Sequence, residues 1–493
     1  MKAPNPKFQA PEKPEIPSSS IDRRLALGSW NLFGKSRCGL EPFRWLCAFG
    51  VLFHFLSVVP AQVLAPLSIG NTNKVYLIDL PTVLRLANAQ NLDIQLARER
   101  LKEAKANHES AVELFFPWIS PGVVYRRHEN QIQDVVGNII DADKQSYSVG
   151  GALTAQVDLG DAVYKSLAAQ QLIDAADHAL ESQRQDSTLA AAQGYYDLAK
   201  AKVTVDVFDE ALHISQDYQK QLHDAVGIGI AFKGDELRVQ TQTERYRITQ
   251  RQALEQQRVA AARLAQTLHL EASVELVPQD ADLVPLALVD TRVPLDSLVQ
   301  QALDSRPELK QSQALVTAAR DAKNGTVYGP LIPTIGAQAF AGGLGGGKNN
   351  STGNFGQSED YFVGLGWRIG PGGLFDVGRV HASKARLETA RLSGAKIKDD
   401  ITRQVVESHV RTQSLQDQLA ATKQNLATAS ETLRLTRERK QFGVGVVLED
   451  LQAQQELTRA RADYLTVIAE YNKAQYALGK AIGRTLSDTE LPK

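Results

Sequence analysis

Cysteine is nearly absent from this 493-residue sequence, and the two cysteines, Cys38 and Cys47, both lie within residues 1–61. That segment is typical of an export leader, because Arg44 precedes the apolar run WLCAFGVLFHFLSVV and the small residue Ala61 closes it. We predict signal-peptide cleavage there, which leaves a mature chain with no thiol, no disulfide and no lipid anchor. A membrane anchor is the alternative, although the apolar run is short for a bilayer span.

Aromatic residues and net charge are also scarce. Phe, Trp and Tyr make up 6% of the sequence, and the formal net charge is −1 at pH 7. Few aromatics favour long, narrow seams between helices over a thick globular core. A near-neutral chain without a basic patch is not typical of nucleic-acid-binding proteins, so we expect no nucleic acid as a partner.

Proline is missing from two long stretches, one between Pro121 and Pro278 and the other between Pro371 and Pro492. Within them we predict uninterrupted helices over residues 161–222 and 379–441, each roughly 90 Å long at 1.5 Å per residue. Apolar residues of the second helix recur at multiples of seven, as in a coiled coil: Val405, Leu419, Leu426 and Leu433. A compact bundle needs no helices of this length. The segments are too polar to cross lipid, so we predict a rigid extension outside the membrane.

The chain is built twice. A helix, a Gly-x-Gly bend and a second helix occupy residues 431–483, and a related stretch precedes it by a constant offset, with Gly229 matching Gly443 and Leu264 matching Leu478. Such a repeat governs the whole fold. We predict the following organisation: leader 1–61, first repeat 62–277, linker 278–294, second repeat 295–485 and tail 486–493. Each repeat is expected to open with a helix, over 80–114 and 295–326, that ends at a proline turn.

Two segments alternate with a period of two and follow those proline turns. In Gln145–Asp158 and Tyr361–Ile369, apolar residues alternate with small or polar ones, which is typical of strands. We expect them to pair with segments near Trp118–Arg127 and Thr334–Leu344, across polar loops 128–144 and 345–359. The prediction is two hairpins, or four strands per chain, within a mainly α fold that has a small β part.

Two hairpins of an ordinary soluble sheet would explain the alternation, and so would a membrane barrel. Four strands cannot close a barrel, because the smallest such barrels need about eight, and lipid does not tolerate an open sheet edge. If the strands span a membrane, several chains must contribute. Three copies would supply twelve strands.

No catalytic constellation emerges. The run GGLGGGKN at residues 342–349 nearly matches a phosphate-binding loop, but it lacks the Ser/Thr for magnesium and no helix is predicted to follow. The histidines show no metal-ligand spacing. The adjacent acids Asp235-Glu236 and Glu449-Asp450 are expected near helix starts, where they either cap the helix or face a pore. We predict no enzyme activity, no metal and no cofactor.

The repeats, the Pro-bounded hairpins and the tip segment QFGVGVVLEDL at 441–451 together resemble the outer-membrane efflux protein family, the TolC-like channels. The tail of the second helix, with Ala462-Asp463-Tyr464, Tyr471-Asn472 and Leu478-Gly479, resembles it too. The resemblance covers about residues 76–485.

The resemblance implies a homotrimer in the outer membrane of a Gram-negative bacterium, with a twelve-stranded β-barrel continued by an α-helical coiled-coil tunnel through the periplasm. Family members meet a periplasmic adaptor (membrane fusion) protein and an inner-membrane pump, and they export drugs, metals or proteins. We therefore predict a passive exit duct of a tripartite efflux pump or a type I secretion system. A periplasmic coiled-coil structural or adaptor protein that never enters a membrane is the alternative.

The resemblance also assigns residues. It implies an adaptor-contacting tip, formed by Gly227, Gly229, Phe442, Gly443 and Gly445. It implies a pore constriction, for which we predict Glu449, Asp235, Gln452, Glu236 and Asp450. An arginine and two aspartates of the TolC tip fall on Gly445, Glu449 and Gln452, so one acid is kept and the basic partner is missing. Closure by that salt-bridge pattern is not expected here.

Overall fold

The computed structural model describes residues 75–484, except 272–273, 280–282, 349–350 and 442–446. All of these residues belong to the unit Thr72–Lys493. The predicted leader 1–61 and tail 486–493 lie outside the described residues. No helix in the described part of the chain has the length and apolar character needed to cross a membrane.

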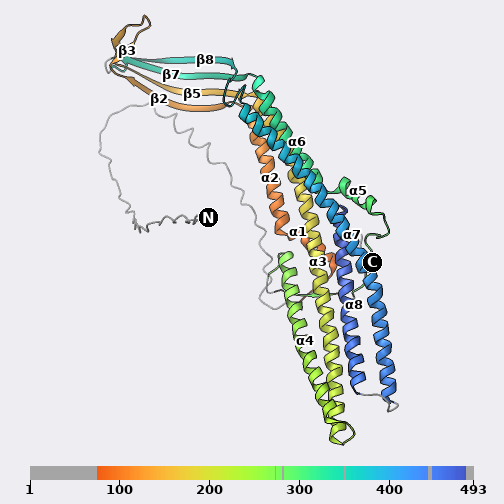
Figure 1. The fold of residues 1–493 in the computed structure, drawn as a ribbon. Coiled ribbons are helices and arrows are strands. Elements are labelled where there is room, and N and C mark those ends of the chain that lie inside the picture. The colour runs from red at the N-terminus through yellow and green to blue at the C-terminus, as the bar shows by residue number, and fades with distance from the viewer. Residues whose placement is uncertain (1–74, 272–273, 280–282, 349–350, 442–446, 485–493) are drawn as a thin grey trace, which may run out of the picture. The chain divides into compact units, whose positions relative to one another are not determined.

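The same series of elements runs twice along the chain (Figure 1). The first series comprises β1 (Val75–Ile78), α1 (Leu80–Gln90), α2 (Leu92–Glu113), β2 (Trp118–His128), β5 (Lys144–Asp158), α3 (Leu159–Gly227) and α4 (Lys233–Thr267). The second comprises β6 (Glu275–Pro278), α5 (Leu295–Ser305), α6 (Pro307–Tyr328), β7 (Thr334–Lys348), β8 (Asn354–Gly366), α7 (Val377–Gln441) and α8 (Val447–Ala481). A small hairpin, β3 (Gln131–Gln133) and β4 (Ile139–Asp141), joins β2 to β5, and a 3-10 turn (Gly329–Leu331) follows α6. The chain is mainly α with a smaller β part, as predicted.

The two opening helices are each broken, where we had predicted one continuous helix. Asn91 is extended, and its Oδ1 accepts hydrogen bonds from the backbone N–H of Asp93 and Ile94, so it ends α1 and caps α2. In the second repeat Arg306 is extended because it precedes Pro307, which clashes with a helical residue before it. The breaks turn α1 and α5 away from the long helices that follow.

The four long strands form one antiparallel sheet in the order β2-β5-β7-β8, in which β5 and β7 join the two predicted hairpins. The predicted strand 361–369 is wrong at both ends, since β8 begins at Asn354 and ends at Gly366. The predicted loop 345–359 is shorter for the same reason. Glycines at 342–347 of β7 have no side chain to reveal the alternation, which hid the ends of this hairpin. The parallel pair β1–β6 was not predicted.

One face of the sheet is apolar and open to the surroundings. Cross-strand register places Ile119, Leu153, Ala339 and Tyr361 in one row on this face. Ile119 is 73% exposed, and Val363, two residues along β8 from Tyr361, is 77% exposed. The opposite face carries small or polar residues such as Ser148, Gln338 and Gly364. Strands β2 and β8 are the two edges of the sheet.

The helices repeat the order of the strands. Each long strand is continuous with one helix, since α2 leads into β2, β5 into α3, α6 into β7, and β8 into α7 (Figure 1). The packed helix pairs are α2–α3, α3–α6 and α6–α7, so the helical layer runs α2-α3-α6-α7 beside β2-β5-β7-β8. Farther along the chain, α3 packs with α4 and α7 with α8 as two helical hairpins.

The main core lies where the short elements pack on the long helices. We call β1, β6, α1, α5 and residues 283–294 the belt. One cluster joins the belt to α3 and α4 through Leu84, Leu264 and Leu276, all at most 1% exposed. A second joins the belt to α7 and α8 through Leu298, Val405 and Leu478. The belt therefore connects both repeats.

Candidate pore constriction and hairpin tips

The bend between α3 and α4 presents apolar side chains to solvent. Ile228, Ile230 and Phe232 are each at least 73% exposed. Gly229 has a φ of +77°, a conformation that favours glycine, whereas Gly227 is the last helical residue of α3. The predicted tip residues of the second hairpin, Phe442, Gly443 and Gly445, lie outside the described residues.

The predicted acids of the first repeat occupy the first turn of α4, where carboxylates are favourable. Asp235 accepts a hydrogen bond from Arg238 Nη1 at 2.9 Å, within its own helix. Glu236 is nearly buried and bridges two cations, with 2.9 Å from Oε1 to His223 Nδ1 and 2.6 Å from Oε2 to Lys233 Nζ. Hydrogen bonds from His223 and then Lys233 lower the pKa of Glu236 below 4.5. Glu236 thus fastens α4 to α3.

The acids of the second repeat stand at the same steps of α8 and have different partners. Glu449 and Asp235 are each the third residue of their helix. Glu449 Oε2 lies 3.2 Å from Arg439 Nη1, and Asp450 Oδ1 lies 4.0 Å from Arg437 Nε. Gln452 is exposed. The family arginine that is missing at Gly445 is thus matched by two arginines of α7.

Arg437 and Arg439 were missed at the level of sequence. The signal was present, since two cations precede the bend and two acids follow it, and a helical hairpin brings such residues face to face. Arg437 also donates from Nη2 to Gln454 Oε1 at 3.1 Å.

A cavity of about 530 Å³ separates the two helical hairpins near Asp450. It is lined by Tyr218 and Gln221 of α3, Tyr246 of α4, Arg437 of α7, and Asp450 and Gln454 of α8, among others. Among the predicted constriction residues, the structure places Asp450 against the first hairpin. Glu449 and Asp235 each have an arginine partner in their own hairpin.

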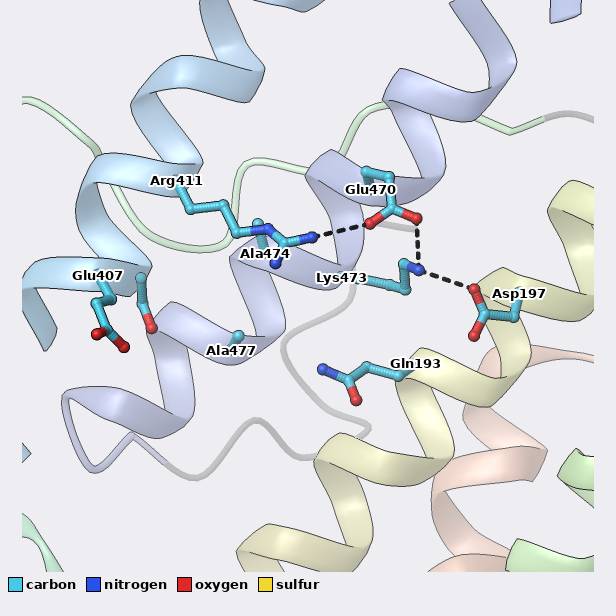
Figure 2. Close-up of a pocket in the computed structure, with 9 residues that line it drawn as sticks. Gln193, Asp197, Glu407, Arg411, Glu470, Lys473, Ala474 and Ala477 are labelled. Carbon is cyan, nitrogen blue, oxygen red and sulfur yellow. Dashed lines mark hydrogen bonds and ion pairs between the residues drawn. The ribbon is translucent and has the colours of Figure 1, made fainter. Parts of the chain in front are cut away.

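A second, smaller cavity of about 340 Å³ lies between α3, α7 and α8, and its charged residues form a network that we call the hub (Figure 2). Lys473 lies between two carboxylates, 2.8 Å from Asp197 and 2.6 Å from Glu470. Arg411 reaches Glu470 from α7 at 3.1 Å. The hub ties the second hairpin to the first repeat.

Burial and charge oppose each other in the hub. Burial would raise the pKa of Glu470, but the hydrogen bond from Lys473 and the charges of Lys473, Lys200 and Arg411 together lower it. Burial would lower the pKa of Lys473, and its two carboxylate partners raise it instead. Both groups therefore stay charged across the neutral range. No cluster of metal-ligating side chains occurs among the residues that the structure describes.

A sheet with an open apolar face and two open edges, continued by helices of 69 and 65 residues, defines a TolC-like outer-membrane channel subunit. The sequence model of the outer membrane efflux protein family matches residues 298–484. The resemblance predicted from the sequence is confirmed.

Solved structures of low sequence identity share the fold. A membrane protein from Pseudomonas aeruginosa superposes with a TM-score of 0.71 and 18% identity, over 83% of this chain and 94% of that one. The CmeC outer membrane channel of Campylobacter jejuni gives 0.70 and 15%, over 82% and 85%. The outer membrane protein VceC of Vibrio cholerae gives 0.68 and 15%, over 82% and 96%. No curated protein matches the sequence.

The family match and the shared fold agree on an efflux channel of the outer membrane, not an enzyme. The matched segment lies in the second repeat. The first repeat has the same elements in the same order.

Proposed function

We propose that the chain is one subunit of a homotrimeric exit duct, which carries substrates passively across the periplasm and outer membrane for a tripartite efflux pump or a type I secretion system. The observation that carries this proposal is the four-stranded sheet with an exposed apolar face and two unpaired edges. In the proposed organisation, repeats 62–277 and 295–485 are joined by linker 278–294.

Three copies satisfy the sheet. Four strands per chain and a minimum of about eight per membrane barrel require at least two chains, and three give twelve strands. Because β8 and α7 form one border of the chain while β2 and α2 form the other, one contact completes both layers. The β8–α7 border of each copy then meets the β2–α2 border of the next.

The duct requires a partner at its far end. At 69 residues, α3 extends roughly 100 Å from the sheet, at 1.5 Å per residue. The bend that closes it exposes Ile228, Ile230 and Phe232, an apolar surface suited to another protein. We assign this bend, with Gly227 and Gly229, and the segment of Phe442, Gly443 and Gly445 to contact with a periplasmic adaptor.

The constriction is proposed at the acids beside those bends. Glu449 and Asp235 are the main candidates, with Glu236, Asp450 and Gln452 beside them. In a threefold assembly, acids that point inward converge around one axis and attract cations. Their arginine partners offset part of that charge. The expected cation selectivity is therefore modest.

Single-channel recording of the full protein in planar bilayers tests this function. The parent should form cation-selective pores, and Glu449→Gln should lower that selectivity. Glu438→Gln is the matched control, because this acid also pairs with an arginine, Arg434, but within α7 alone. A parent protein that forms no pore would contradict the duct itself. Equal selectivity in Glu449→Gln and the parent would contradict only the constriction.

A further inference from the structure

Two polar side chains of α8 are buried completely, although α8 is a helix with many charged residues. Asn472 is 1% exposed and Gln475 is 0% exposed. They stand three positions apart, which puts them on one side of the helix. Asn472 belongs to the Tyr471-Asn472 pair, to which neither the duct nor the constriction gives a role.

Both side chains hold the backbone of the segment that joins the two repeats. Asn472 uses both ends of its amide: Oδ1 accepts from Leu286 N–H at 2.8 Å, and Nδ2 donates to Val284 C=O at 2.9 Å. Gln475 Oε1 accepts from the N–H groups of Leu288 and Val289 at 3.2 and 2.8 Å. We call Asn472, Gln475 and residues 284–289 the clasp.

The clasp meets a physical need. Residues 284–289 belong to no helix or strand, so their buried N–H groups require partners from elsewhere. Gln475 is itself fixed, since its Nε2 donates to Tyr471 O–H at 2.9 Å. Sliding or rotation of α8 at this level would break four hydrogen bonds to buried groups at once.

On its other side, the same part of α8 is tied to α3. Lys473 pairs with Asp197 in the hub, and Lys480 pairs with Asp186 one to two turns farther along. Toward the bend the attachment is weaker. The ion pair between Arg461 and Glu210 is largely exposed, and such pairs contribute little. Still closer to the bend, the 530 Å³ cavity leaves room between the hairpins.

We infer that the clasp is the fixed pivot of the α7–α8 hairpin, and that Asn472 and Gln475 are positioning residues for its movement. The hairpin is anchored at the belt and free to swing at the bend, so the clasp sets the resting width of the channel end. This inference rests on the proposed duct function. Its contacts can nevertheless be tested without any transport.

Hydrogen exchange on the full protein in detergent tests the contacts first. In Asn472→Ala/Gln475→Ala, amides of residues 284–289 should exchange about tenfold or more faster than in the parent. Asn91→Ala is the matched control, because Asn91 is also a buried amide that holds a backbone carbonyl, Thr267 C=O, but it lies in the first repeat. It should leave exchange at 284–289 unchanged. Equal exchange in the double variant and the parent would overturn the clasp.

Single-channel recording then tests the pivot. The double variant should remain trimeric and spend at least about threefold more time in high-conductance states, while Asn91→Ala should match the parent. Gln475→Glu keeps the acceptor oxygens and should also match the parent. Asn472→Asp keeps the size but sets a carboxylate against Val284 C=O. It should show the same change at smaller amplitude, and it decides the question if the double variant fails to assemble. Parent-like gating in Asn472→Asp, despite faster exchange at 284–289, would show a structural tie and overturn the pivot. A parent without pores would instead count against the duct.

Discussion

The sheet and the belt distribute polar and apolar side chains in opposite ways. The sheet exposes Val363 and Ile119 at 77% and 73%, whereas the belt region buries Gln475 and Arg306 at 0% and 2%. Every buried polar group just named finds its partners within the chain. The apolar face and the open edges of the sheet do not. The belt is therefore complete in one copy, and the sheet is completed by lipid and by further copies.

The largest effect is expected from the buried arginine of the belt. Arg306 donates to both oxygens of Glu308 at 2.8 and 2.6 Å and also reaches Gln404. Arg306→Ala removes the partner of a partly buried carboxylate and should cost about 3–5 kcal/mol of unfolding free energy. Denaturant unfolding of the detergent-solubilised protein measures it. Arg439→Ala, which removes an exposed pair with Glu449, should cost about 1 kcal/mol or less. Equal costs would contradict the contrast between buried and exposed pairs.

The next effect concerns the face of the sheet. Val363→Arg puts a charge on the apolar face and should cost about 2–4 kcal/mol if that face meets lipid. Gln338→Arg puts the same side chain on the other face, one position away from the Ala337 partner of Val363, and should be tolerated. Folding of both variants into lipid vesicles compares the faces. A larger loss for Gln338→Arg would reverse the assignment of the faces.

A smaller and pH-dependent effect is expected at the hub. The stabilisation from Glu470 is present above its ordinary pKa of 4.5 and is lost as pH falls through its lowered folded value. The stabilisation from Lys473 is present below 10.5 and is lost as pH rises through its raised folded value. Stability should therefore be greatest between these limits. Lys473→Met should cost about 1.5–3 kcal/mol at pH 7 and flatten both limbs in a series of melting temperatures. Unchanged limbs would show that the hub contributes no pH dependence.

The long-period features were predictable from the sequence, because they depend on local patterns. The helices over 161–222 and 379–441 follow from missing prolines, and the hairpins follow from alternation. The break at Arg306 was visible too, since Pro307 restricts the residue before it. The clasp was not visible, because Asn472 and Gln475 look like solvent-facing helical residues until residues 284–289, almost 190 positions away, lie over them. The pairing of β1 with β6 is equally remote.

The candidate site was predictable in its acids and not in their partners. Asp235 and Glu449 stand at matching steps because the repeat preserves register. Which cation reaches each acid depends on side-chain direction across a hairpin, as with Arg439 and Glu449. Whether these acids line a pore remains a prediction.

One cross-linking measurement tests the central claim that neighbouring copies complete the sheet. The mature chain is predicted to have no cysteine, so one cysteine at Val124 in β2 and one scanned along residues 356–364 of β8 report edge contacts. Oxidation of the full protein in outer membranes, read on a denaturing gel, should give linked dimers and trimers and nothing larger. Linked species at some β8 positions that stop at three copies would agree with a closed twelve-stranded sheet. A protein that dissolves without detergent and yields only unlinked chains at every β8 position would contradict it.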